Sequence, residues 1–105
     1  MPFWFSHIHP EDSVLDFGCG GGYLLSLLSA SYKLGVEINP AARYAAQKLG
    51  LDVFPALDEV NDYSFSRVIS SHALEHIPSP LVALKQLCMK IAQGGKLLLL
   101  LPMDD

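Results

Sequence analysis

The chain has 105 residues, of which 50% are hydrophobic and 17% are charged, so disorder is excluded and one domain with a modest core is expected. The net charge of −4, with only seven Lys and Arg, argues against a nucleic-acid groove. Two cysteines far apart in sequence, no export signal and no long apolar run predict a cytoplasmic protein without a disulfide or a membrane span.

Five short strands are predicted from apolar runs bounded by turn residues. They lie at 13–17, 32–38, 51–54, 65–71 and 96–101. The last strand holds consecutive leucines, which suit a parallel strand covered on both faces. A single helical turn at 57–60 is expected between the third and fourth strands.

Three helices are predicted between these strands. The first, over 24–28, follows a glycine-rich turn and is expected to bury all its leucines on one face. The second runs over 41–49 with Asn39 as its N-cap residue. The third begins after Ser79 at a proline and is expected to end at the glycine pair 94–95.

Alternation of strands and helices predicts an α/β fold, a doubly wound, three-layer Rossmann-like parallel sheet with strand order 3-2-1-4-5. In that order the chain adds strands on one side of the first strand and then continues on its other side, so the order reverses between the first and fourth strands. Ligands bind beyond the carboxyl ends of strands at such a point. The glycine-rich turn after the first strand is therefore predicted to lie at a binding site.

The glycine-rich turn links an acid at the end of the first strand to the first helix. Gly18, Gly20 and Gly22 allow positive φ and a close approach of a ligand to the backbone. Their spacing departs from the dinucleotide pattern G-x-G-x-x-G, which disfavours NAD. The run Asp16-x-Gly18-x-Gly20-x-Gly22 resembles the first motif of class I methyltransferases that use S-adenosylmethionine.

This resemblance implies roles for residues after the first two strands. The glycine loop would pass beside the methionine part of the cofactor, and Asp16 would help to hold its amino end. Glu37 closes the second strand 17 residues after Gly20, and one carboxylate accepts hydrogen bonds from both hydroxyls of a ribose. Ile38 would line the adenine. The alternative for Glu37 is a solvated side chain that caps the following helix.

The loop after the third strand holds Pro55, Ala56 and Leu57, where the family contacts adenine. Many members also carry an acid there for the adenine amino group, and Asp58 lies a residue or two later than that acid. An ordinary turn is the alternative interpretation of this loop.

The segment 70–80 after the fourth strand, with its Leu-Glu-His run, resembles the same region of small-molecule and quinone-type methyltransferases. Its histidines at 72 and 76 could accept a proton from a hydroxyl nucleophile, although packing of a short helix is the alternative. No catalytic residue is assigned. The predicted cofactor-binding residues are Asp16, Phe17, Gly18, Cys19, Gly20, Gly22, Glu37, Ile38, Ala56, Leu57, Ser71 and His72.

The stretch His72-Ala73-Leu74-Glu75-His76 also spells the zinc-protease motif H-x-x-E-H. A zinc site of that kind needs a stable helix and a further ligand, whereas Pro78 would cut this helix short. Zinc is therefore kept only as a remote alternative, and no metal ligand is assigned.

The resemblance covers residues 13–101 and implies a single, partial cofactor-binding domain over 1–105 that lacks the last two strands of the family. The exposed fifth strand predicts either a fragment of a longer chain or a homo-oligomer that pairs through this edge. The expected function is transfer of a methyl group from S-adenosylmethionine to a small-molecule acceptor, giving S-adenosylhomocysteine. A non-catalytic module that binds the cofactor or serves as a scaffold is the alternative.

Overall fold

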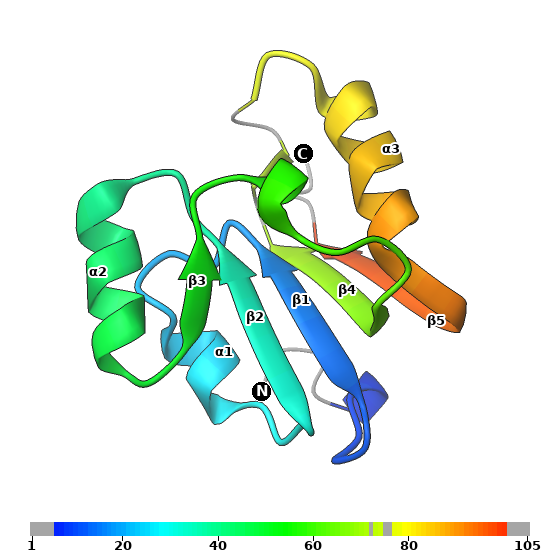
Figure 1. Ribbon diagram of the computed structural model, residues 1–105, viewed down its shortest axis with the longest axis horizontal. Helices are drawn as coiled ribbons and strands as arrows, with labels where there is room; N and C mark the ends of the chain where they lie inside the picture. The colour runs from blue at the N-terminus through cyan, green and yellow to red at the C-terminus, as the bar shows by residue number, and fades with distance from the viewer. Residues whose placement is uncertain (1–5, 72, 75–76, 101–105) are drawn as a thin grey trace, which may run out of the picture.

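The computed structural model describes residues 6–71, 73–74 and 77–100. Its five strands form one parallel sheet in the order β3-β2-β1-β4-β5, which confirms the predicted topology (Figure 1). The strands are β1 Ser13–Phe17, β2 Tyr32–Val36, β3 Asp52–Phe54, β4 Phe65–Ser71 and β5 Ile91–Leu100. β1 and β4 have the predicted bounds, β2 ends two residues earlier than predicted, and β3 begins one residue later.

Helices cover both faces of this sheet. They are α1 Tyr23–Leu27, α2 Pro40–Lys48 and α3 Pro80–Lys90, with a 3₁₀ turn, η2, at Leu57–Glu59. Successive strand residues point to opposite faces, so Leu15 packs in the core beneath α3 and Val14 in the core beneath α1 and α2. In the described part of the chain, no helix has the length and apolar character needed to cross a membrane.

The expectation that helix α1 buries all its leucines on one face is wrong. Leu25 and Leu28 are buried, whereas Leu24 and Leu27 are 39% and 51% exposed. The helix has only five residues, and Leu28 already has extended backbone angles. A single turn cannot place four leucines within five residues against one surface.

The predicted boundary between α3 and β5 is also wrong. The helix ends at Lys90 and the strand begins at Ile91, because the backbone N–H groups of Tyr63 and Ser64 donate to the last helical carbonyls, Met89 and Lys90. Ile91 pairs with Phe65, but the next paired residues are Lys96 and Arg67. The extra residues of β5 form a bulge in which Gly94 has φ +80°.

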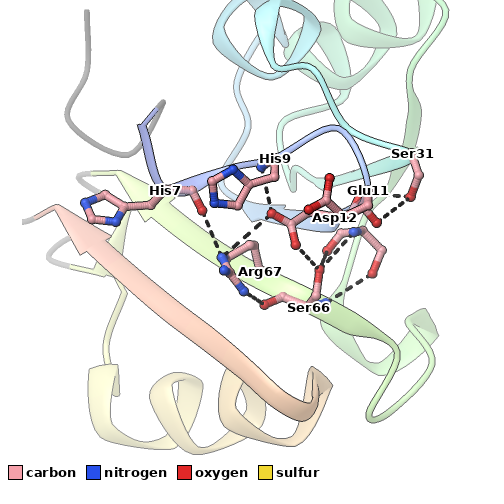
Figure 2. Close-up of polar contacts among 8 residues, drawn as sticks. His7, His9, Glu11, Asp12, Ser31, Ser66 and Arg67 are labelled. Carbon is pink, nitrogen blue, oxygen red and sulfur yellow. Dashed lines mark hydrogen bonds and ion pairs between the residues drawn. The ribbon is translucent and has the colours of Figure 1, made fainter.

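Asp12, just before β1, joins the segment preceding the sheet to β4 (Figure 2). Its carboxylate accepts hydrogen bonds from the His9 N–H at 2.7 Å and the Ser66 hydroxyl at 2.8 Å. The Arg67 guanidinium lies 3.8 Å from the same carboxylate and donates to the His7 carbonyl at 2.9 Å. Desolvation by burial opposes ionisation, but these hydrogen bonds and the charge of Arg67 hold the pKa of Asp12 below its usual value.

Candidate cofactor site

The site lies at the carboxyl ends of β2, β1 and β4. The pairing register places Val36, Phe17 and Ser70 side by side. Glu37 and Gly18, the next residues after β2 and β1, therefore leave the sheet at the same edge, where Ser71 is the last residue of β4. This edge includes the switch between β1 and β4, where the sequence predicted a ligand site.

The glycine loop after β1 has a backbone that only glycine adopts easily. Gly18, Gly20 and Gly22 have φ of +78°, +58° and +83°. A Cβ on Gly18 would lie 2.6 Å from the Cβ of Ala73, and a Cβ on Gly22 would lie 2.8 Å from that of Ala46. Gly20 has open space around it, so the middle of the loop is accessible to a bound molecule.

Glu37 is fixed by the backbone on both sides of its carboxylate. The Gly20 N–H donates to Oε1 at 2.8 Å, and the Asn39 N–H donates to Oε2 at 3.0 Å. Each carboxylate oxygen accepts about two hydrogen bonds, so each keeps one free position. Asn39, not Glu37, caps helix α2 through hydrogen bonds from Ala41 and Ala42, so the capping alternative for Glu37 is wrong.

Asp16 is a buried acid on β1. Its residue is 8% exposed, and no N–H or O–H among the described residues donates to its carboxyl group. Burial, and then the nearby charge of Glu37, raise the pKa of Asp16 to about 7. A buried carboxyl group left unpaired is costly, so this position favours a ligand that brings a cationic donor.

Cys19, in the glycine loop, packs against Gly35 of β2. A Cβ on Gly35 would be only 2.6 Å from the Cys19 sulfur, so the thiol occupies the space above that glycine. Burial, then the charges of Asp16 and Glu37, raise the pKa of Cys19 to about 12. The thiol is therefore neutral at physiological pH and suited to packing, not to nucleophilic chemistry.

A cavity of about 530 Å³ opens at this edge of the sheet. That volume lies within the range of small-molecule and cofactor sites. Its described walls come from β1, β2, the loop after β3, the end of β4 and α3. The lining residues are Phe17, Gly18, Val36, Glu37, Ile38, Pro55, Ala56, Leu57, Ser71, Ala73, Ile77, Ala83 and Gln86.

The structure places seven of the predicted cofactor-binding residues on this cavity: Phe17, Gly18, Glu37, Ile38, Ala56, Leu57 and Ser71. Asp16, Cys19, Gly20 and Gly22 are not among its lining residues, and Asp58 is exposed outside it. His72 lies outside the described residues. Gly20 instead orients Glu37, and Gly22 packs against α2.

Sequence reasoning missed the wall that α3 contributes, above all Ala83 and Gln86. The helical spacing had assigned the apolar residues of α3 to the core, and nothing in the pattern distinguished Gln86 from a solvated side chain.

The alternative zinc motif includes His72, Glu75 and His76, which lie outside the described residues. Within the part of the chain that is described, no three His, Cys, Asp or Glu side chains are grouped as metal ligands.

A parallel sheet of order 3-2-1-4-5, with Asp16 on β1, a glycine loop after β1 and Glu37 after β2, is the arrangement that the resemblance to class I methyltransferases implied. A model of the methyltransferase domain family matches residues 3–105, and the chain belongs to this family. It is a methyltransferase domain, and its fold is that of solved S-adenosylmethionine-dependent methyltransferases.

Solved structures agree in fold. An S-adenosylmethionine-dependent methyltransferase from Thermotoga maritima matches with a TM-score of 0.77 and 24% identity, over 90% of this chain and 46% of that chain. Ribosomal protein L11 methylase from Lactobacillus delbrueckii subsp. bulgaricus matches with a TM-score of 0.72 and 18% identity, over 90% and 54%. A complex of DhpI with S-adenosylhomocysteine matches with a TM-score of 0.66 and 24% identity, over 81% and 46%.

Curated relatives are similar in sequence over most of the chain. Ribosomal protein L11 methyltransferase from Ralstonia pickettii is 34% identical over 107 residues, covering 94% of this chain and 35% of that protein. The tRNA U34 carboxymethyltransferase from Shewanella amazonensis is 33% identical over 113 residues, covering 89% and 33%. The chain thus spans about a third of the length of these relatives.

Proposed function

We propose that residues 1–105 form the cofactor-binding domain of a methyltransferase and that Glu37 binds the ribose of S-adenosylmethionine. This proposal rests mainly on the hydrogen bonds that the Glu37 carboxylate accepts. Backbone N–H groups of Gly20 and Asn39 fix its two oxygens and leave one accepting position on each. Two adjacent hydroxyl groups match this arrangement, because each donates one hydrogen bond.

The apolar part of the cavity suits the adenine ring. Ile38 presents apolar surface from the turn after β2, and Pro55 and Leu57 present it from the loop after β3 and from η2. Ile38 is 82% exposed, so a flat ring placed against it would remove apolar surface from water. The Arg43 guanidinium donates to the carbonyls of Glu37 and Ile38, which holds this turn in place.

The unpaired carboxyl group of Asp16 suits the amino end of the cofactor. An ammonium group would supply the charge and the donors that the described residues do not provide. The open backbone at Gly20 leaves room for the chain that joins the amino end to the ribose.

When bound, S-adenosylmethionine supplies a methyl group activated by its positively charged sulfur. The residues of this chain hold and orient the cofactor so that the methyl group is presented to an acceptor, and the apolar walls limit access of water. No described side chain is assigned as a base, because methyl transfer depends chiefly on alignment.

We infer that the acceptor is a small molecule. The net charge of −4 disfavours the dense phosphate contacts of a tRNA. The named relatives differ, since one is a ribosomal protein methyltransferase and one acts on tRNA U34. A lysate incubated with the protein and labelled S-adenosylmethionine, then separated by size, should carry the label among small molecules, and label in tRNA or protein would contradict this inference.

We also propose that two copies of the chain associate by pairing their β5 strands. β5 lies at the edge of the sheet, and among the described residues β4 is its strand partner. Such an edge can pair with a second chain. Sedimentation of the purified protein should reveal a dimer or a larger species, whereas a monomer at all concentrations would contradict association through β5.

Calorimetric titration with S-adenosylhomocysteine tests the ribose site. Glu37→Ala should weaken binding by about 1.5–3 kcal/mol, because charge-assisted hydrogen bonds to the ribose are lost. Glu59→Ala is the matched control, because this exposed glutamate lies on η2 outside the cavity lining. If Glu37→Ala and the wild type bind S-adenosylhomocysteine with equal affinity, Glu37 does not bind the ribose.

A further inference from the structure

We infer that Gln86 on helix α3 is the residue that selects a 6-aminopurine in the cavity, by hydrogen bonding to the edge of the adenine ring. This inference rests on the proposed function. It gives a specificity-determining role to a helix whose sequence pattern predicts only core packing.

The position of α3 directs Gln86 toward the loop after β3. Lys90 follows Gln86 by four residues, so both side chains lie on the same face of the helix. The Lys90 ammonium donates to the Val60 carbonyl at 2.8 Å and lies 2.7 Å from the Asp62 carboxylate. These two contacts of Lys90 hold the face of α3 that carries Gln86 and Lys90 against the segment between β3 and β4, which includes η2.

Two apolar neighbours of Gln86 on this helix pack against the same segment. Ala83 and Leu87 are 7% and 0% exposed and pack in one core with Leu57 of η2. Ala83 and Gln86 both line the cavity. The Gln86 side chain is exposed, and no group among the described residues forms a hydrogen bond with its amide.

The lining residues leave few other candidates for recognition of the purine edge. Among the described ones, the side chains that can form hydrogen bonds are those of Glu37, Ser71 and Gln86. Glu37 is held at the glycine loop by Gly20. Asp58, which the sequence analysis considered for the adenine amino group, lies outside the cavity lining.

The chemistry of the amide matches that of adenine. The 6-amino group of adenine donates hydrogen bonds, and each ring nitrogen beside it accepts one. A glutamine amide offers one carbonyl acceptor and one NH₂ donor in the same plane, so it can form both bonds at once. A purine without the 6-amino group loses one of these bonds and leaves the carbonyl of Gln86 unpaired.

The experiment measures the affinities of two ligands for three proteins by calorimetry. The ligands are S-adenosylhomocysteine and its analogue that carries purine without the 6-amino group. The proteins are the wild type, Gln86→Leu and the matched control Gln93→Leu, whose glutamine is exposed on β5 outside the cavity lining. Leucine favours helices and position 86 is exposed, so the Gln86→Leu variant is expected to fold.

The wild type and Gln93→Leu should prefer S-adenosylhomocysteine over the analogue by roughly tenfold, the value of one good hydrogen bond in a binding site. Gln86→Leu should bind both ligands with equal affinity. If Gln86→Leu keeps the wild-type preference, the role of Gln86 is refuted while the ribose site stands. If the wild type binds neither ligand, the proposed function fails together with this inference.

Discussion

Replacing Asp16 with asparagine should make the protein more stable at neutral and alkaline pH and, at the same time, weaken cofactor binding. The Asp16 carboxyl group is buried without a donor among the described residues, and its pKa is raised from 3.8 to about 7. Since one pKa unit corresponds to 1.36 kcal/mol, ionised Asp16 costs the folded state on the order of 4 kcal/mol. Asparagine has nearly the same shape and carries no charge.

The sign of the pH dependence follows from the raised pKa. The folded state keeps the Asp16 proton up to about pH 7, whereas the unfolded state loses it near 3.8. The folded state therefore binds more protons in this window, and stability falls as the pH rises through it and levels off above it. Between pH 5 and 8 the wild type should lose about 3 kcal/mol relative to Asp16→Asn.

Urea unfolding of both proteins without ligand, at intervals from pH 5 to 8, measures this difference. The four histidines and the other acids are common to both, so the difference isolates position 16. At pH 8 the variant should be more stable by about 1–3 kcal/mol, after allowance for its own unmade hydrogen bonds. Asp58→Asn, at an exposed position, should follow the wild type, and parallel curves for Asp16→Asn and the wild type would refute the reasoning.

Three further predictions concern packing and reactivity. Asp12→Ala should lower the free energy of unfolding by roughly 1–3 kcal/mol in a urea titration, because the Arg67 guanidinium loses its carboxylate; an unchanged midpoint would contradict this. Gly18→Ala should lower the melting temperature, because the new Cβ would meet that of Ala73 at φ +78°, and a wild-type melting curve would count against the loop geometry. Iodoacetamide at pH 8 should label exposed Cys88 well before Cys19, and peptide mass spectra showing the reverse would contradict the raised pKa of Cys19.

The topology was predictable because local patterns and chain connectivity determine it together. The β4 segment, Phe65–Ser71, begins and ends where its sequence indicates. Asn39 followed by a proline predicts a helix start, and its side chain does accept hydrogen bonds from Ala41 and Ala42. Right-handed crossovers then leave few strand orders.

The end of α3 was not predictable from the same kind of signal. Glycines at 94 and 95 are typical helix stops, yet the helix ends at Lys90. Its last carbonyls are satisfied by Tyr63 and Ser64, which lie far away in sequence. A tertiary hydrogen bond of this kind overrides a local stop signal.

The site was predictable where it depends on strand ends and not where it depends on helix packing. Glu37 follows β2 directly, so its position beside the glycine loop was implied by the motif spacing. The hydrogen bond from the Gly20 N–H to that carboxylate was not, because it depends on the loop conformation. Gln86 lines the cavity from α3, and Lys90 of the same helix donates to the Val60 carbonyl, a contact between segments distant in sequence.

A crystal structure with S-adenosylhomocysteine tests the central claim most directly. The proposal predicts both ribose hydroxyls within hydrogen-bond distance of the Glu37 carboxylate and the adenine ring between Ile38 and Leu57. A ligand bound elsewhere, or a ribose without contact to Glu37, would contradict it.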